Sequence, residues 1–586
     1  MALLKENLEA EPLTSQSFVV NLHELQPKVL QTLQKMQEEN VIARIWSLDH
    51  TIWKSEPAEI TNRLGWLRSP QWMTEKIAGV VSFVESLRQD GFTHALLLGM
   101  GGSSLAPEVF KTTFGVKSGY LDLAVLDSTD PQAVLAHTKN LDLQKTLFIV
   151  STKSGGTVET LSFFKYCFNL VVKALGWERV GEHFIAITDP GSSLVELAHE
   201  YRFRETFLND PNIGGRYSVL SYFGLLPAGL LGLDLNRLLE RTYRMAENCR
   251  AENDLLHGDN TAVWLGAIMG ALANAGRDKL TLVASPALAH FGVWAEQLVA
   301  ESTGKDGTGI LPVNGEDLAA PEFYGLDRLF VYLKLAGDDC LDEKIDKIKR
   351  ADQPVVQLLL QDVYDLGGEF FRWELATAVA GHILRVNPFD QPNVESAKVQ
   401  ARKMVETYQE QGELPQPSPT FEDGGISVFT DLSVSNLKQA MSQFLANAST
   451  ADGAGKKGDY LALQAYVHPT EEARAALHKI RLRLRDKYKL PTTVGFGPRF
   501  LHSTGQLHKG DAGNGLFIQI TADSLEDVDI PDKAGAEASS ISFGVLKLAQ
   551  ALGDRRALLD AGRKVIRFHL GTDVLAGLKR LEQVLA

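Results

Sequence analysis

Short apolar runs that alternate with helical stretches constrain the fold of this chain most. Four of them have the length and composition of buried strands: His94–Leu98, Leu121–Leu126, Thr146–Val150 and Phe184–Thr188. Buried strands separated by helices are typical of βαβ units, which build a parallel sheet with helices on both faces. The sequence therefore predicts an α/β fold.

Further runs extend this pattern along the chain. Leu280–Ala284, Leu329–Leu333 and Val355–Leu360 predict a second set of strands, after a long apolar helical block that begins at Val219. Apolar positions recur with helical spacing over residues 24–40 and 70–90, which indicates helices ahead of the first strands. The first part of the chain therefore predicts a helical lead-in followed by two α/β lobes.

The last part of the chain predicts one more α/β unit. Leu461–Val467 and Leu516–Ile520 resemble strands, with a helical stretch at Thr470–Tyr488 between them. Residues 409–426 are rich in proline and polar side chains, as linkers often are. We expect five segments: a helical lead-in (1–90), a first lobe (91–275), a second lobe (276–408), a linker region (409–455) and a smaller C-terminal α/β lobe (456–586).

Composition excludes several classes of protein. The formal net charge of −14 argues against a nucleic-acid partner, because phosphate backbones require a basic face. No apolar run approaches the roughly 18 residues that cross a bilayer, and Met1–Glu6 lacks the charge pattern of a signal peptide. The cysteines Cys167, Cys249 and Cys340 are too far apart for a zinc site or a disulfide framework. We expect a cytoplasmic protein without a metal, a cofactor or a membrane partner.

Two segments that follow predicted strands suit a phosphate group. Gly99–Ser104 is a glycine-rich turn before a helix, where backbone N–H groups and the helix dipole favour an anion. Ser151–Thr160 brings hydroxyls, a lysine and two glycines into one turn, without the ending of a nucleotide-binding P-loop. The alternatives are a plain tight turn and a helix N-cap with spare hydroxyls.

Glu301 is a candidate for proton transfer. Residues 294–305 predict a helix that ends at Gly304, which places Glu301 in the last turn. The negative end of the helix dipole is expected to raise the pKa of a carboxyl there, as a general base near neutrality requires. The same segment, taken alone, favours a solvated surface glutamate.

Five segments in order along residues 95–400 resemble glucose-6-phosphate isomerase. They are Gly99–Ser104, Ser151–Thr160, Gly214–Ser221, Gln297–Lys305 and Asn387–Lys398. The chain as a whole is similar to the isomerase half of bifunctional transaldolase/glucose-6-phosphate isomerase proteins, and no transaldolase half is present. The resemblance implies two sugar-isomerase (SIS-type) lobes around a sugar phosphate, and a homodimer.

The resemblance also implies roles for individual residues. It places the substrate phosphate among Ser103, Thr152, Lys153, Ser154 and Thr157, with the sugar beside Gly102. Threonine stands at position 152 where the family commonly has serine, which keeps the hydroxyl.

In the family, a glutamate that matches Glu301 moves a proton between C2 and C1 of the open sugar through a cis-enediol. Arg216 would stabilise the charge on that intermediate. Gln297 and Gln391 would hold hydroxyls or phosphate, and Lys398 would assist ring opening. Without the resemblance, Arg216 is also compatible with a structural arginine and Lys398 with a surface lysine.

One expected residue is missing from its usual place. The family opens the sugar ring with a histidine between the glutamate motif and the next strand, and residues 301–329 contain none. The segment Phe500–Gly510 resembles the missing piece and carries His502 and His508. We predict that this segment folds back over the site, with His502 as the replacement and His508 second in line. His502 would act in its own subunit or in a partner's, and the alternative is that both are ordinary loop histidines.

Three other functions remain open from the sequence. The chain could be a sugar-phosphate-binding regulator without catalysis, although Glu301, Arg216, Gln391 and Lys398 together favour an enzyme. It could be an isomerase of a related anionic hexose. The C-terminal block could also serve interaction or oligomerisation rather than catalysis.

Overall fold

The computed structural model describes residues 17–250, 255–258, 260–446, 448–451 and 458–585. Its longer strands lie in three sheets, and the α/β prediction is confirmed. The segment Met1–Glu6, on which the absence of a signal peptide was argued, lies outside the described residues. No helix among the described residues is long and apolar enough to cross a membrane.

The first sheet is entirely parallel and has the order β3-β2-β4-β5-β6. Its strands are β2 (His94–Gly99), β3 (Asp122–Leu126), β4 (Thr146–Ser151), β5 (Phe184–Thr188) and β6 (Glu205–Leu208). Its helices are α4 (Leu105–Phe114), α5 (Pro131–Thr138), α6 (Val158–Leu175) and α7 (Ser193–Glu200). Leu96 and Leu97 face opposite cores, so both faces are buried and the strands read as continuous apolar runs.

The second sheet has the order β1-β10-β9-β7-β8 and is parallel except for its first strand. Its strands are β1 (Phe18–Asn21), β7 (Lys279–Ala284), β8 (Leu311–Val313), β9 (Arg328–Leu335) and β10 (Val355–Leu360). Its helices are α11 (Phe291–Thr303), α12 (Asp342–Arg350) and α13 (Leu366–Leu384).

The N-terminal lead-in is helical where helices were predicted, but it also contributes a strand. Its helices are α1 (Gln26–Glu38), α2 (Val41–Trp46) and α3 (Ser69–Gln89). Ahead of them, β1 pairs antiparallel with β10 at the edge of the second sheet. The apolar block after the first sheet forms α8 (Tyr222–Leu230), α9 (Leu235–Arg250) and α10 (Thr261–Asn274). These helices share one core with parts of the first two sheets.

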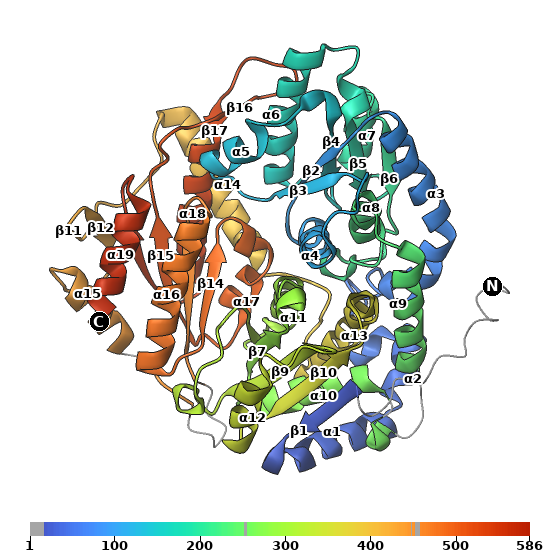
Figure 1. The fold of residues 1–586 in the computed structure, drawn as a ribbon. Coiled ribbons are helices and arrows are strands. Elements are labelled where there is room, and N and C mark those ends of the chain that lie inside the picture. The colour runs from blue at the N-terminus through green and yellow to red at the C-terminus, as the bar shows by residue number, and fades with distance from the viewer. Residues whose placement is uncertain (1–16, 251–254, 259, 447, 452–457, 586) are drawn as a thin grey trace.

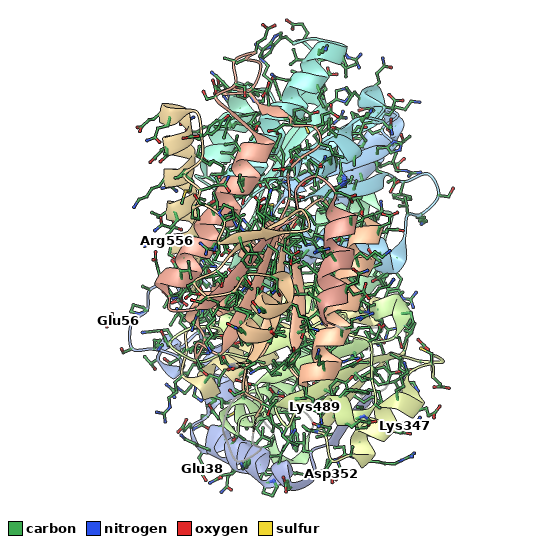
Figure 2. The ribbon with its side chains drawn as sticks, turned by 90° about the vertical axis from the view of Figure 1, so that its left-hand side faces the viewer. Glu38, Glu56, Lys347, Asp352, Lys489 and Arg556 are labelled. Carbon is green, nitrogen blue, oxygen red and sulfur yellow. The ribbon has the colours of Figure 1, made fainter. Side chains whose placement is uncertain are left out.

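The third sheet has the order β11-β12-β18-β15-β13-β14. Its strands are β11 (Phe421–Asp423), β12 (Ile426–Phe429), β13 (Tyr460–Tyr466), β14 (Thr492–Phe496), β15 (Gly515–Thr521) and β18 (Lys564–His569). Its helices are α15 (Leu437–Ala446), α16 (Glu471–Tyr488), α17 (Gly505–Gly510), α18 (Phe543–Asp560) and α19 (Val574–Leu585). Figure 2 views the molecule from this side, where exposed charges such as Lys489 and Arg556 point outward.

Part of the linker predicted over residues 409–455 belongs instead to the third sheet and its core. The hairpin β11–β12 adds to the third sheet through β18, and α15 lies in the same core because its apolar face is buried there. The helix α14 (Val394–Gln411) precedes the hairpin and lies against α18, where the backbone of Ala401 approaches Gly553.

The three sheets surround the centre of the molecule, where α11 and α17 meet (Figure 1). A small hairpin of β16 (Asp529–Ile530) and β17 (Ile541–Ser542) reaches from the third unit to α6 of the first. Ile530 and Phe543 of that region join the core of the first sheet. The C-terminal unit is therefore built into the rest of the fold.

Candidate active site

Two turns that were predicted to bind phosphate lie side by side. Because β2 and β4 are parallel neighbours with Gly99 opposite Ser151, the turns that follow them emerge at the same edge of the sheet. The Ser151 hydroxyl donates a hydrogen bond to the carbonyl of Ser103 at 3.3 Å. The helices α4 and α6 begin immediately after these turns, so the positive ends of both dipoles lie at this edge.

Glycines are required in the first turn. A Cβ on Gly102 would lie 2.0 Å from the carbonyl oxygen of Gly215, which precedes Arg216. Gly101 has a φ of +55°, and a Cβ there would lie 2.9 Å from the carbonyl oxygen of His502. Close backbone contact therefore holds this turn against two segments that are distant in sequence.

The second turn presents hydroxyl groups, but its lysine is engaged elsewhere. The hydroxyls of Thr152 and Thr157 lie 2.9 Å apart. The Lys153 ammonium forms an ion pair with Asp189 and donates to the carbonyl of Pro211 at 3.1 Å. The structure thus brings the predicted hydroxyl residues Ser103, Thr152, Ser154 and Thr157 to one edge, and it directs the Lys153 side chain to Asp189.

Arg216 lies in the interior of the site and is held by several acceptors. It is 4% exposed. Its guanidinium donates hydrogen bonds to Ser302 Oγ (2.7 Å), Gln391 Oε1 (2.9 Å), Pro388 O (2.7 Å) and Asp390 O (2.9 Å). Its Nη1 also lies 3.4 Å from Glu301 Oε1. The segments around Arg216, Glu301 and Gln391 therefore converge in space.

Glu301 occupies the last turn of α11, as expected. Its side chain is 13% exposed, which excludes the alternative of a freely solvated glutamate. Gln297, one turn earlier, donates hydrogen bonds to Glu301 Oε2 at 3.1 Å and to the carbonyl of His502 at 2.8 Å. The helix ends at Thr303 with Gly304 as its C-cap, and glycine is needed there because a Cβ would lie 2.4 Å from the Cα of Leu507 in α17.

Lys305 is buried next to Arg216 and contacts the same residue, Asp390. Its side chain is 1% exposed and forms an ion pair with Asp390 at 2.8 Å. Burial, together with the positive charge of Arg216, lowers the pKa of Lys305 from 10.5 to about 8. Lys305 had no role in the sequence-based prediction, although it ends the Glu301 motif.

Lys398 lies at the margin of this arrangement. Its side chain is 52% exposed, and its ammonium lies 3.5 Å from Glu395 on the same helix. Its positive charge is close enough to Glu159 to contribute to lowering the pKa of that carboxyl. The structure therefore places Lys398 on the Glu159 side of the site without a direct contact to Glu301 or Arg216.

His502 reaches the first sheet from the third unit of the same chain. It ends η13 (Arg499–His502), and its Nε2 lies 2.9 Å from Glu159 Oε1. Gln550 donates to the same carboxylate oxygen at 2.7 Å. Burial alone would raise the pKa of Glu159, but the charge and hydrogen bond of His502 outweigh it, so the pKa is lowered. Glu159 therefore stays ionised beside the imidazole.

His508 has a different environment. It is 2% exposed, lies between aromatic rings of the third unit and is hydrogen-bonded to Gln464 at 3.3 Å. Burial lowers the pKa of His508 well below its ordinary value. It belongs to the core beneath α17, and it does not share the surroundings of His502.

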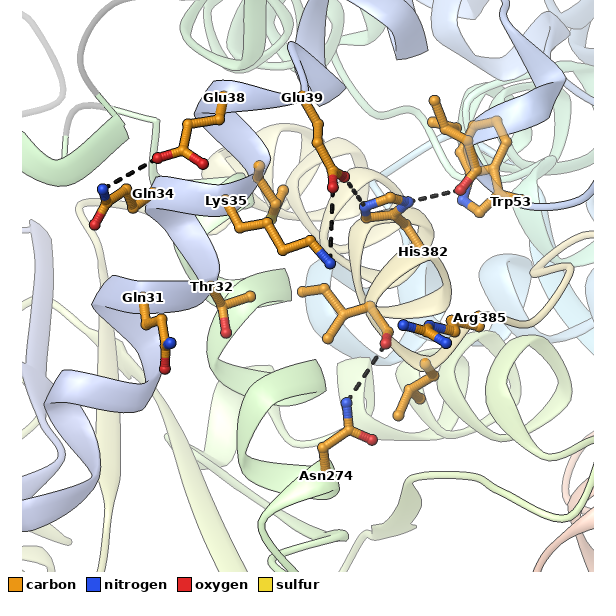
Figure 3. A pocket seen from close by; sticks show the side chains of 14 residues that line it. Gln31, Thr32, Gln34, Lys35, Glu38, Glu39, Trp53, Asn274, His382 and Arg385 are labelled. Carbon is orange, nitrogen blue, oxygen red and sulfur yellow. Dashed lines mark hydrogen bonds and ion pairs between the residues drawn. The ribbon is translucent and has the colours of Figure 1, made fainter.

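A cavity of about 900 Å³ lies away from these residues. It is lined by α1 and by the C-terminal ends of α10 and α13, with Lys35, Glu39, His382 and Arg385 around it (Figure 3). His382 bonds to the carbonyl of Ile52 at 2.6 Å. Among the described residues, no group of three or more His, Cys, Asp or Glu side chains could hold a metal ion.

Comparison with known proteins shows which family this chain resembles. The family model for phosphoglucose isomerase matches residues 80–310. Glucose-6-phosphate isomerase of Carboxydothermus hydrogenoformans is 30% identical over 57% of this chain and 83% of that protein. The glucose-6-phosphate isomerase of Rubrobacter xylanophilus is 28% identical over 57% of this chain and 87% of that protein.

Solved structures show the same fold. A hypothetical protein from Thermus thermophilus superposes with a TM-score of 0.57 at 25% identity, over 66% of this chain and 99% of that one. A glucose-6-phosphate isomerase from Chlamydia trachomatis has a TM-score of 0.56 at 18% identity, over 68% of this chain and 90% of that one. The third sheet, which supplies His502, lies beyond the residues that the family model matches.

Proposed function

Since this chain belongs to the phosphoglucose isomerase family, we propose that its site interconverts glucose 6-phosphate and fructose 6-phosphate. The observation that carries the proposal is the contact between Glu301 and Arg216 beside the hydroxyl-lined turns of the first sheet. The chain is an isomerase of this family.

The phosphate end of the substrate binds at the edge of the first sheet. The hydroxyls of Ser103, Thr152, Ser154 and Thr157 donate to phosphate oxygens, supported by the N-terminal ends of α4 and α6. Lys153 contributes its backbone, since its ammonium is bound by Asp189. Gly102 gives the sugar close access to the backbone.

Glu301 acts as the base. It removes the proton from C2 of the open-chain aldose and returns it to C1, which leaves a ketose after a cis-enediol intermediate. Negative charge develops on the oxygens at C1 and C2 during this step. Arg216 is fixed beside Glu301 by four hydrogen bonds and requires no reorganisation to stabilise that charge. Gln297, which contacts Glu301, and Gln391, which contacts Arg216, bind substrate hydroxyls.

His502 opens the sugar ring. A hydrogen bond from Nε2 to the ionised Glu159 fixes the orientation of the imidazole and leaves Nδ1 for the substrate. Proton transfer to the ring oxygen and removal of the proton from the C1 hydroxyl release the open aldehyde. Lys398 assists from the margin of the site. Because His502 and Glu159 belong to one chain, ring opening is proposed to occur within a single subunit.

The third unit is thus proposed to have a catalytic part, rather than to serve interaction alone. We retain residues 91–275 and 276–408 as the two sugar-isomerase lobes and start the third unit near residue 421 instead of 456. Homodimer formation and a cytoplasmic location are also proposed. The cysteines Cys167, Cys249 and Cys340 are free thiols, which suits a reducing compartment.

A coupled assay tests the proposed activity. The purified chain should convert fructose 6-phosphate to glucose 6-phosphate, and Glu301→Gln should lose roughly 10²- to 10⁴-fold in kcat because a general base contributes that much. The KM of the variant should change little. Tight binding of fructose 6-phosphate without turnover would instead favour a sugar-phosphate sensor, and turnover confined to another anionic hexose would change the substrate.

A further inference from the structure

A second cavity, of about 460 Å³, lies where the three units meet. Its lining includes Leu105 of α4, Val293 and Glu296 of α11, Arg474 and Arg481 of α16, and Arg499 of η13. A cavity of this size suits a small metabolite. None of these side chains takes part in the proposed isomerisation.

One face of α16 supplies basic groups to this cavity. Arg474, His478 and Arg481 are spaced at i, i+4 and i+7, so they lie along the same side of the helix. The Arg474 guanidinium lies 4.7 Å above the ring of Phe496, which also lines the cavity. His478 is paired with Asp317 at 3.1 Å.

Arg481 has a more unusual environment than Arg474 or His478. It is 3% exposed, and its Nε and Nη2 have no hydrogen-bond partner among the described residues. The nearby carboxylate of Glu316 lies 3.4 Å from Arg328 and 4.0 Å from Arg485. A buried guanidinium without a partner is costly, and native structures normally satisfy such a group. The unsatisfied Arg481 therefore points to a ligand.

The charges in the cavity favour an anion. Arg499 is already offset by Glu108 and by Asp127, whose carboxylate lies 3.3 Å away. Arg474 donates a hydrogen bond to the carbonyl of Pro469 at 3.2 Å, and neither Arg474 nor Arg481 makes an ion pair within 4.0 Å in the described parts of the chain. The remaining carboxyl, Glu296, has its pKa raised to about 7 by burial, so it can donate a hydrogen bond when protonated. Two guanidiniums and a carboxylic acid can together bind a phosphate.

We propose that this cavity binds a small organic phosphate monoester and that its occupancy acts on the isomerase site. Arg474 and Arg481 neutralise the phosphate, and Val293, Val494 and Phe496 contact the carbon skeleton. The proposed ligand binds at a different place from the substrate, because η13 and α11 lie between the cavity and the isomerase site.

Those two elements also connect the sites. On η13, Arg499 faces the cavity, whereas His502 binds Glu159 in the isomerase site. On α11, Glu296 faces the cavity, and its neighbour Gln297 contacts Glu301. A ligand that draws Arg499 or Glu296 would therefore shift residues proposed for ring opening and proton transfer. This part of the inference rests on the proposed isomerase function.

Binding is tested with phenyl phosphate, a monoester that cannot be isomerised. A Thr157→Asp background places a carboxylate in the isomerase phosphate site, where aspartate remains a good helix N-cap. By isothermal titration, this background should bind one phenyl phosphate per chain. Adding Arg474→Ala should weaken the affinity by about tenfold or more, since a charge-assisted contact is lost. Adding Lys479→Ala, which removes an exposed charge from the same helix, should leave it unchanged.

Two results would overturn the proposed cavity site. The first is a wild type that binds one phenyl phosphate while the Thr157→Asp background binds none. The second is equal affinity for phenyl phosphate in the background and in its combinations with Arg474→Ala and Lys479→Ala. Because Arg481 is buried, Arg481→Met serves as the second variant, with its melting temperature measured alongside, and it should weaken binding like Arg474→Ala. Inorganic phosphate should bind more weakly than phenyl phosphate, and equal affinities would refute the apolar contacts.

The effect of ligand binding in the cavity on catalysis is measured in a separate experiment. At saturating fructose 6-phosphate, competition in the isomerase site is removed, so a remaining change of kcat with phenyl phosphate reports the cavity. Arg474→Ala should abolish that change without altering the basal rate. Unchanged kcat in the wild type would refute the coupling, whereas a chain without isomerase activity would refute the proposed function and leave the binding result intact.

Discussion

Replacing Glu159 with glutamine separates ring opening from proton transfer. Glu159 Oε1 accepts hydrogen bonds from His502 at 2.9 Å and from Gln550 at 2.7 Å, and the amide oxygen of glutamine can occupy the same position. The substitution thus keeps the shape of the site and removes the negative charge. A hydrogen bond to a charged group contributes about 1.5–3 kcal/mol and a neutral one about 0.5–1.5 kcal/mol, so losing the charge costs about 1–1.5 kcal/mol, which corresponds to roughly 5- to 13-fold in rate.

The expected loss of kcat/KM is confined to substrates whose sugar ring must open. With cyclic glucose 6-phosphate, kcat/KM of Glu159→Gln should fall by roughly 5- to 13-fold. Erythrose 4-phosphate carries its phosphate on the hydroxyl that would close a ring, so it remains open. Its proton exchange at C2, followed by NMR in heavy water, should be nearly unchanged.

A matched control is Glu200→Gln, which makes the same change at an exposed ion pair with Lys533. This control should leave both substrates unaffected. Equal losses on the cyclic and the open substrate, or no loss on either, would refute the assignment of His502 and Glu159 to ring opening. His502→Gln should reproduce the pattern of Glu159→Gln.

The remaining predictions concern binding, stability and pH. Thr157→Val should raise the KM for fructose 6-phosphate about tenfold through a lost hydrogen bond to phosphate, whereas Lys153→Met should change it far less; the reverse order in steady-state kinetics would contradict the proposed phosphate contacts. Gly304→Ala should lower the free energy of unfolding by about 1–3 kcal/mol in denaturant titrations, because the added Cβ would lie 2.4 Å from the Cα of Leu507. Lys305 has a folded pKa of about 8 against an ordinary 10.5, so between these values the unfolded chain holds a proton that the folded chain has released. The free energy of unfolding should therefore rise with pH in that window relative to Lys305→Met, and parallel profiles would exclude the shift.

Truncation is a poor test of the third unit, because its residues complete other cores. Ile530 and Phe543 lie in the core of the first sheet, and Leu507 packs near the end of α11. Removing everything after about residue 426 would expose both surfaces. The point variants described above isolate chemistry more cleanly than a shortened chain does.

The sheets were largely predictable because their strands are buried on both faces. Continuous apolar runs such as Thr146–Val150 need no tertiary information to be recognised. The edge strand Phe18–Asn21 escaped prediction because it is short and lies just before helical residues. The hairpin at 421–429 was hidden by the prolines that precede it, although Ile426 and Val428 are buried.

The site was predictable only in part. Motifs located Glu301, Arg216 and Gln391, but their contact depends on chain segments that fold together from far apart. Glu159 lies within the serine- and threonine-rich turn Ser151–Thr160, where its local sequence indicates no role. Its signal, an acid in the first turn of a helix, becomes meaningful only beside His502, 343 residues later in the chain. The pairing of Lys153 with Asp189 was likewise not readable from local sequence.

A crystal structure with glucose 6-phosphate bound would test the central claim most directly. We predict that the phosphate contacts the hydroxyls of Ser103, Thr152 and Thr157, that Glu301 lies within hydrogen-bond distance of the substituents at C1 and C2, and that His502 of the same chain contacts the ring oxygen. A phosphate bound elsewhere, or a ring oxygen contacted by a side chain of a partner subunit, would contradict the account.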